Sequence, residues 1–239
     1  MNSTDDSQGF QADVIGHAIW SHHFEKKVCE VELIIDGMED EPMLSTHFFR
    51  TESEMNAAEL EALNQCKGRV LDVGAGAGCH ALLLQQRGIE VLALERSALS
   101  CEVMRARGVR EVGEADVMSL SDQQFDTILL LMNGFGIAGT EDGLVSLLCH
   151  LKTLLAPGGR ILGDSTDIRY FKEESASLDL SAGSPCEVEF EVRCNGKSQV
   201  FPWIYPDEVL LEVLAEEAGL QYQTVMHTDD YHFLCEIYV

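Results

Sequence analysis

The sequence predicts an α/β fold, in which a doubly wound, mostly parallel seven-stranded sheet has an antiparallel C-terminal hairpin strand and follows an N-terminal extension. Short apolar segments alternate with helical ones between residues 69 and 163. A glycine-rich turn joins the first of these strands to its helix. The length of 239 residues suits one large domain. We therefore expect an extension over residues 1–66 and a main domain over residues 67–239.

The extension has the pattern of helical or mixed structure, with an acidic loop at residues 37–42. Thr51 and Glu54 have the spacing of a capping box, and Leu60 follows in an apolar helical pattern. We therefore expect a helix to begin at Thr51. Residues 1–10 are polar and acidic and lack the features of a secretory signal, which favours a cytoplasmic protein.

The main domain alternates strands with helices. Gly88 and Gly108 end two of the expected helices. The apolar run at residues 125–132 is typical of a strand that is covered on both faces. The expected strands cover residues 69–73, 89–94, 109–113, 125–132 and 160–163, and the expected helices cover residues 79–87, 97–107 and 140–155.

The tail predicts a hairpin, a helix and two final strands. Residues 187–193 and 198–205 alternate around Asn195-Gly196, a pair that favours a hairpin turn. Pro206 suits the start of a helix that we expect to end at Gly219. The last two expected strands cover residues 221–227 and 231–239.

The composition restricts the partners of the chain. Sixteen Lys and Arg stand against 41 Asp and Glu, so a formal net charge of −25 would repel the phosphates of nucleic acids. No apolar run approaches the roughly 20 residues that cross a bilayer. The eight cysteines include no CxxC pair, so we expect reduced thiols and no metal site. We therefore expect no nucleic-acid or membrane partner, and either a monomer or a homodimer.

The segment from Asp72 to Gly78, with the sequence DVGAGAG, carries the clearest functional signal. Glycines at every second position let the backbone bend sharply and approach a ligand closely. The helix that follows offers free N–H groups and the positive end of its dipole. Glu95 ends the next strand, 21 residues after Gly74, where a carboxylate can accept hydrogen bonds from two ribose hydroxyls. The pattern indicates a nucleoside-type ligand.

Two ligands of this type compete. Residues 76–81 fit the GxGxxA pattern of a dinucleotide site, which would make the chain a nicotinamide-dependent oxidoreductase. Asp72 opposes that interpretation, because a carboxylate at this point would repel a pyrophosphate. The same carboxylate suits the ammonium group of an amino acid. The sequence therefore favours a nucleoside with a cationic amino-acid tail.

On these residues the chain resembles the class I S-adenosylmethionine-dependent methyltransferases. The glycine signature of that family matches residues 72–78, and the acidic residue that closes its second strand matches Glu95. Three further marks follow in family order: Asp116-Val117, the Phe125-Asp126 pair before an apolar strand, and the segment LAPGGRIL at residues 155–162.

The resemblance implies S-adenosylmethionine as the cofactor. We expect a small-molecule acceptor, because the chain suits a single domain, is strongly acidic and contains no nucleic-acid-binding module, and we expect the extension to contribute to the acceptor pocket. Asp72 and the glycine backbone would hold the amino-acid portion, and Glu95 the ribose. Arg96, Asp116 and Val117 would surround the adenine. The implied cofactor-binding residues are Asp72, Gly74, Ala75, Gly76, Gly78, Glu95, Arg96, Asp116, Val117, Met132 and Asn133, the last two lying near the sulfonium.

The sequence does not identify the atom that receives the methyl group. Holding donor and acceptor in line is the larger part of such catalysis, and a general base becomes useful only for a hydroxyl or thiol acceptor. The candidate bases are His22, His23 and Asp164, with His80 also considered. Residues 133–136 depart from the family pattern for methylating amide or base nitrogens. The alternatives are a non-catalytic protein that binds the cofactor and a protein methyltransferase.

Overall fold

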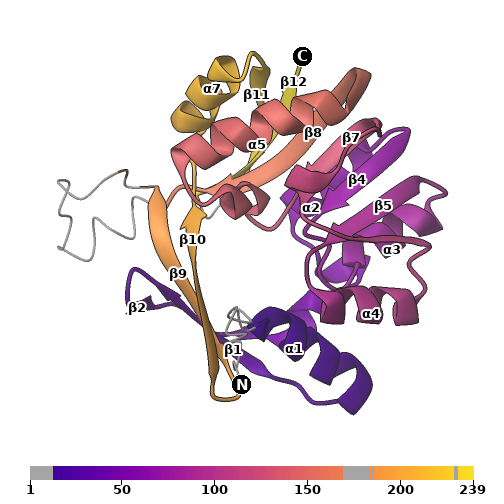
Figure 1. The fold of residues 1–239 in the computed structure, drawn as a ribbon, viewed down its shortest axis with the longest axis vertical. Helices are drawn as coiled ribbons and strands as arrows, with labels where there is room; N and C mark the ends of the chain where they lie inside the picture. The colour runs from indigo at the N-terminus through magenta and orange to yellow at the C-terminus, as the bar shows by residue number, and fades with distance from the viewer. Residues whose placement is uncertain (1–12, 169–183, 185, 229–230) are drawn as a thin grey trace, which may run out of the picture.

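The computed structural model describes residues 13–168, 184, 186–228 and 231–239; residues 1–10, for which no secretory signal is expected, lie outside these ranges. Seven strands form the main sheet in the order β11-β12-β8-β7-β4-β5-β6 (Figure 1). They are β4 (Arg69–Val73), β5 (Glu90–Glu95), β6 (Glu111–Glu114), β7 (Phe125–Leu130), β8 (Leu155–Thr166), β11 (Gln221–His227) and β12 (His232–Tyr238). β4 is parallel to β5 and β7, whereas β12 is antiparallel to β8 and β11. The predicted mostly parallel sheet with an antiparallel C-terminal strand is confirmed.

Helices cover both faces of this sheet, which explains why residues 128–130 of β7 are all apolar. Ile128 and Leu130 point into one core cluster and Leu129 points into the other, and none of the three is exposed. The first cluster lies under α5 (Glu141–Leu154) and α7 (Glu208–Glu217). The second lies under α2 (Ala57–Gln65), α3 (Cys79–Gln86) and α4 (Ala98–Arg107).

The helix expected to begin at Thr51 starts later, at a second capping box that Asn56 and Glu59 form. The box at Thr51 exists but closes only the 3₁₀ turn η3 (Glu52–Glu54). Met55 follows in an extended conformation, with φ −78° and ψ 146°, and so separates the turn from the helix. The spacing of residues indicated the first box correctly but could not show that the backbone leaves the helical region after it.

The hairpin expected at Asn195-Gly196 is confirmed, but it belongs to a second sheet. Both residues have positive φ, 52° and 75°, as a tight hairpin turn requires. β9 pairs antiparallel with β10 on one edge and with β1 on the other. The sheet therefore joins segments from both sides of residue 66. Its strands are β1 (Glu30–Ile35), β2 (Met38–Glu39), β3 (Met43–Leu44), β9 (Glu187–Cys194) and β10 (Lys197–Ile204).

Helix α1 (Val14–Trp20) connects the second sheet to the main domain (Figure 1). Its N-cap residue Asp13 accepts a hydrogen bond of 2.6 Å from the hydroxyl of Ser97, the N-cap residue of α4. Ala18, on the buried face of the helix, belongs to one cluster with Val192 of β9. The extension therefore packs against both the main domain and the second sheet.

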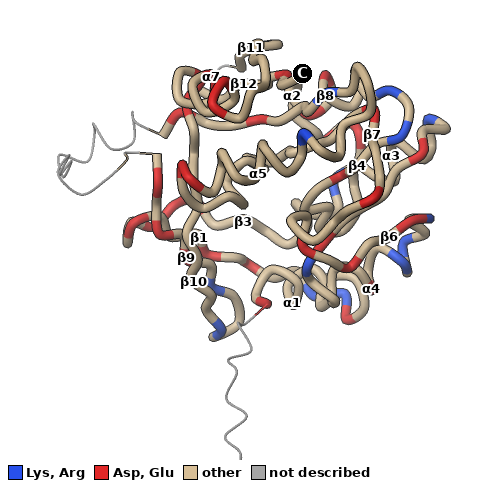
Figure 2. The backbone as a smooth tube through the Cα atoms, turned by 45° about the horizontal axis from the view of Figure 1, so that its top comes forward, with Lys and Arg blue, Asp and Glu red and all other residues tan. Residues whose placement is uncertain are grey.

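Asp and Glu residues occur on most elements, whereas Lys and Arg occupy scattered positions along the backbone (Figure 2). This distribution follows from the composition, which is strongly acidic along the whole chain. Within the ranges that the structure describes, no helix combines the length and the apolar composition needed to cross a bilayer.

Candidate cofactor site

The glycine turn lies at the carboxyl end of β4, between this strand and α3. Gly74, Gly76 and Gly78 have φ values of 71°, 55° and 81°, in the left-handed region that other residues avoid. A Cβ on Gly78 would lie 2.8 Å from a methyl group of Val109, so this position also needs glycine for packing. A Cβ on Gly74 would meet nothing within 4 Å. The turn therefore offers open space at its first glycine.

The N–H groups of the turn are largely used within the protein. Gly74 and Ala75 both donate to the carbonyl oxygen of Leu94, at 2.9 and 3.1 Å. Gly76 donates to Oε2 of Glu95 at 3.0 Å. These three N–H groups therefore all have partners within the protein. The turn can serve a ligand by close approach of its backbone rather than by donating hydrogen bonds there.

Glu95 ends β5 and holds the turn in place. Besides Gly76, its carboxylate accepts the N–H groups of Arg96 and Ser97, at 2.7 and 2.9 Å. Burial raises the pKa of Glu95 above its usual value, and the three N–H donors only partly oppose this shift. The side chain therefore lies beside the glycine turn, and its ribose role stays a prediction.

Asp72 has a buried oxygen that no described residue satisfies. The residue is 2% exposed, and its Oδ2 atom has no hydrogen-bond partner. Its other oxygen, Oδ1, lies 3.9 Å from Nδ1 of His80. A buried carboxylate oxygen is costly unless it is paired, so this atom suits a cationic group of a ligand. The residues present therefore fit the amino-acid end of S-adenosylmethionine.

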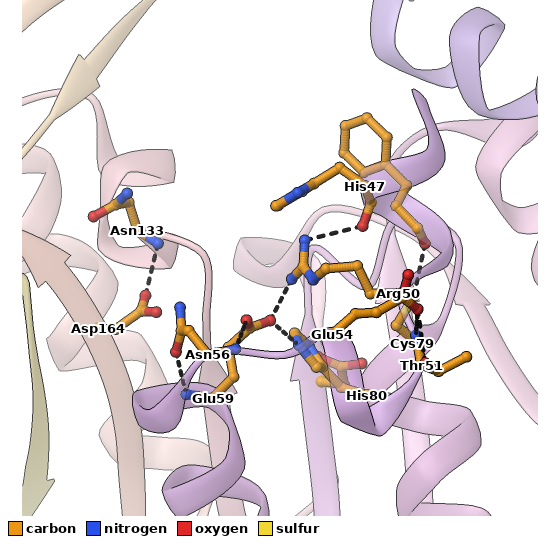
Figure 3. Close-up of polar contacts among 12 residues, drawn as sticks. His47, Arg50, Thr51, Glu54, Asn56, Glu59, Cys79, His80, Asn133 and Asp164 are labelled. Carbon is orange, nitrogen blue, oxygen red and sulfur yellow. Dashed lines mark hydrogen bonds and ion pairs between the residues drawn. The ribbon is translucent and has the colours of Figure 1, made fainter. Parts of the chain in front are cut away.

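Asp72 is one end of a buried charge network. The imidazole of His80 donates from Nε2 to Glu59 at 2.9 Å, and Arg50 donates to the same carboxylate oxygen (Figure 3). Burial alone would raise the pKa of Glu59, but the bond from His80 and the charge of Arg50 outweigh it and lower the pKa to about 2. Burial alone would lower the pKa of His80, but Asp72 and Glu59 raise it to about 9. His80 and Glu59 are therefore both charged at neutral pH. Glu59 is a residue that the sequence analysis did not single out.

The stability of the protein is expected to depend on this histidine. Because the pKa of His80 rises from 6.5 to about 9 on folding, its stabilising contribution is complete below pH 6.5 and is lost as the pH rises through 9. We expect the difference in unfolding free energy between wild type and His80→Gln to shrink between pH 6 and pH 10 by on the order of 2–3 kcal/mol. Urea unfolding at both pH values measures it. A difference that is the same at both pH values would contradict the prediction.

The residues implied for the adenine lie further along the same edge of the sheet. Arg96 follows β5, Asp116 follows β6, and their side chains form an exposed ion pair of 3.6 Å. The Asp116 carboxylate accepts the N–H of Met118 and so caps the turn η4 (Val117–Ser119). Val117 is buried.

Met132 and Asn133 follow β7 and are held in a strained conformation. Both have left-handed φ values, 62° and 57°, although neither is glycine. The N–H of Asn133 donates to Oδ1 of Asp164 at 2.6 Å (Figure 3), and its side-chain oxygen accepts the hydroxyl of Thr166 at 2.9 Å. Oδ2 of Asp164 contacts Nε2 of His232 at 3.1 Å. The sequence did not single out His232, because its partner is 68 residues away and no motif connects them.

The three candidate bases do not form one cluster. His22 and His23 lie in the π-helical turn η1 (Ser21–Glu25), where both rings stack with Phe49. Burial, and then the charge of Lys26, lowers the pKa of both histidines. Asp164 lies at the carboxyl end of β8, is 1% exposed and has both oxygens engaged. His80 is part of the network beside Asp72. Asp164 therefore holds the backbone of Asn133 in place.

Comparisons with known proteins find methyltransferases similar to this chain. A family model described as a methyltransferase domain matches residues 70–159, which include the glycine turn, Glu95 and Asp116. The cypemycin N-terminal methyltransferase of a Streptomyces species is 30% identical over 107 residues, 43% of this chain and 44% of that protein. The chain therefore matches less than half the length of this curated relative.

Solved structures extend the match to nearly the whole chain. A SAM-dependent methyltransferase from Bacteroides fragilis, crystallised with S-adenosyl-L-homocysteine, has a TM-score of 0.85 and 34% identity, with 96% of this chain and 95% of that chain covered. The CcbJ methyltransferase from Streptomyces caelestis has a TM-score of 0.57 at 15% identity, with 78% and 94% covered, and shares the fold.

Proposed function

This chain belongs to the class I S-adenosylmethionine-dependent methyltransferases, and on that premise we propose that it transfers the methyl group of its cofactor to a small-molecule acceptor. The observation that carries the proposal is the buried, unpartnered Oδ2 of Asp72 beside the open space at Gly74. A site of this kind suits a cationic amino-acid tail that approaches a bare peptide turn.

The packing of the extension supports a small acceptor. A Cβ on Gly76 would lie 3.8 Å from Phe48 and 4.0 Å from Ile19, so side chains of the extension lie over the glycine turn. We expect residues 1–66 to act as a cap of this kind and to contribute to the acceptor pocket. A cap formed by the chain itself favours an acceptor small enough to enter beneath it.

Each residue of the predicted site then has a role. Asp72 binds the ammonium group, Glu95 the ribose hydroxyls, and the backbone at Gly74, Ala75, Gly76 and Gly78 allows the close approach. Arg96, Asp116 and Val117 surround the adenine, and Met132 and Asn133 lie on the sulfonium side. The last two are held by the contacts of Asn133 with Asp164 and Thr166.

The chemistry relies on positioning. S-adenosylmethionine supplies an electrophilic methyl group on a good leaving group. Correct placement of donor and acceptor can lower the activation barrier by roughly 7–11 kcal/mol. A general base contributes less, a rate enhancement of about 10²–10⁴-fold. The left-handed pair at residues 132–133, held by Asp164, is suited to this task because it fixes the backbone beside the reacting groups.

A peptide amine is the second candidate acceptor. The curated relative is a methyltransferase of the N-terminus of cypemycin, and its matched segment is 30% identical to this chain. The strongly acidic composition would attract a cationic amine in either a small molecule or a peptide. A methyl-transfer assay with a pool of small amines beside a pool of short peptides separates the two acceptors. Turnover of peptides alone would contradict the proposal.

Calorimetric titration with S-adenosylmethionine and S-adenosylhomocysteine tests the cofactor site directly. We expect Glu95→Gln to weaken binding by at least ~1.5 kcal/mol, the scale of a hydrogen bond to a charged group. Glu114→Gln is the matched control, because Glu114 pairs in register with Glu95 on the neighbouring strand and has no role in the proposed site. Equal binding by both variants would remove Glu95 from the site.

A further inference from the structure

Two buried cysteines meet where the extension pairs with the second sheet. Cys29 lies directly before β1, and Cys194 is the last residue of β9. They are 4% and 7% exposed, and the thiol of Cys194 hydrogen bonds with that of Cys29. Both cysteines are reduced in the structure. Thiols in such contact need little movement of the backbone to form a disulfide.

The pairing of the two strands explains this contact. β1 and β9 are antiparallel neighbours, with Leu33 opposite Val192. Because side chains alternate between the faces of a sheet, Cys29 lies on the face of Leu33, and Cys194 lies on the face of Val192. The same register, continued by two residues, sets Cys194 opposite Val31 and diagonal to Cys29. All of these side chains except Leu33, which packs against it, belong to one buried cluster.

The surroundings of the two sulfur atoms differ. Asn195, in the hairpin turn, donates a hydrogen bond of 3.4 Å from Nδ2 to Sγ of Cys29. A thiolate accepts such a bond more strongly than a neutral thiol, so we expect Cys29 to react first. Burial, and then the neighbouring Cys29, raises the pKa of Cys194 to about 11. Cys194 therefore reacts slowly by itself at neutral pH and follows as the second thiol.

The other described cysteines have different partners. Cys66 and Cys101 are also buried, but their thiols donate to the backbone carbonyls of Ala62 and Glu95. Cys149 is exposed. Among the described residues, no group of three or more His, Cys, Asp or Glu side chains could hold a metal ion. The contact between Cys29 and Cys194 is therefore one between two thiols and not part of a metal centre.

We propose that Cys29 and Cys194 are a modification site at which hydrogen peroxide converts the two thiols into a disulfide. The sulfur of Cys29 attacks one peroxide oxygen and breaks the O–O bond, which gives a sulfenic acid and one water. The sulfur of Cys194 then attacks the sulfur of this sulfenic acid, forms the S–S bond and releases a second water. The two sulfurs lose two electrons, which reduce the peroxide, and both thiol protons leave in the waters.

The disulfide would fasten the extension over the glycine turn. It closes a loop that includes strands β4 to β8 of the main sheet, and cross-links that close long loops stabilise most. Cys29 and Ser45 exchange two hydrogen bonds, from the Cys29 N–H to the Ser45 hydroxyl at 2.9 Å and from the Ser45 N–H to the Cys29 carbonyl at 2.8 Å. Ser45 begins the turn η2 (Ser45–Phe49), whose Phe48 faces Gly76. This effect goes beyond the proposed function, because it depends on neither the cofactor nor the acceptor.

Peroxide treatment of the full chain tests the site. The chain carries Cys149→Ser, which removes the exposed thiol, and is incubated with hydrogen peroxide at pH 8. Non-reducing peptide mapping by mass spectrometry is expected to show the peptide of Cys29 linked to that of Cys194 as the main product. The oxidised protein is expected to melt at least about 5 °C above the reduced one. Dithiothreitol should restore the lower melting temperature.

Three further variants in the same background provide the controls. Cys29→Ser and Cys194→Ser should each remove both the linked peptide and the rise in melting temperature. Cys101→Ser is the matched control, because Cys101 is fully buried and its thiol contacts backbone carbonyls instead of a second thiol. It should keep both effects. If a serine variant fails to fold, the peptide map of the parent chain still decides.

The outcomes that overturn the proposal are specific. Peroxide could convert Cys29 and Cys194 separately into sulfinic or sulfonic acids, or link one of them to a different cysteine. It could also leave both reduced while other cysteines are oxidised. Each of these results overturns the site. A linked peptide without a rise in melting temperature keeps the site but overturns its stabilising effect on the extension.

Discussion

Asp72→Asn is expected to weaken the binding of S-adenosylmethionine and S-adenosylhomocysteine by about 10- to 100-fold, the scale of a charge-assisted hydrogen bond lost in a buried site. Asp72 is 2% exposed, so water cannot replace the carboxylate. Asn keeps the shape of the side chain but removes the charge that an ammonium group requires. Calorimetric titration measures the change.

The control for this variant is Asp207→Asn. Asp207 is also a buried aspartate, 8% exposed, and it caps α7 by accepting the N–H of Leu210. Asn is a good N-cap residue, so this substitution should change neither the fold nor the affinity. Equal affinities of Asp72→Asn and the wild type would refute the assignment of Asp72, even if the protein still bound the cofactor.

Gly74→Ala is expected to reduce cofactor affinity at least about tenfold while it costs only about 1–2 kcal/mol of stability. The stability cost follows from φ at 71°, which an alanine adopts with strain. The new methyl group would clash with no protein atom, since nothing lies within 4 Å of it. It would instead project into the space that the proposed cofactor occupies.

Gly158→Ala separates these two effects. Gly158 has φ at 77° and equally open surroundings, but it lies at the start of β8, away from the glycine turn. Urea unfolding should therefore give similar losses of stability for the two variants, and titration should give a loss of affinity for Gly74→Ala alone. Indistinguishable affinities would show that the space at Gly74 is not part of the site.

Part of the cofactor site could be predicted, because the residues that indicate it lie close together in the sequence. The spacing of Asp72, the glycines and Glu95 within one strand-turn-helix-strand unit is enough to indicate a nucleoside with an amino-acid tail, and the comparisons support the same cofactor. The individual roles of these residues stay predictions until the titrations are made. Glu59 and His232 were out of reach, because their contacts join residues that the sequence separates and no motif marks them.

The sequence by itself determined the alternation of strands and helices that builds the main sheet. It also determined the helix ends at Gly88 and Gly108 and the hairpin at Asn195-Gly196. These features depend on side-chain periodicity and on backbone angles that one or two residues control. The tertiary structure alone decided that the hairpin pairs with β1 across more than 150 residues of chain. It also decided that Leu94 and Glu95 take up the N–H groups of the turn. Long-range pairing and the burial of charges depend on which surfaces meet after folding, and local sequence does not encode this.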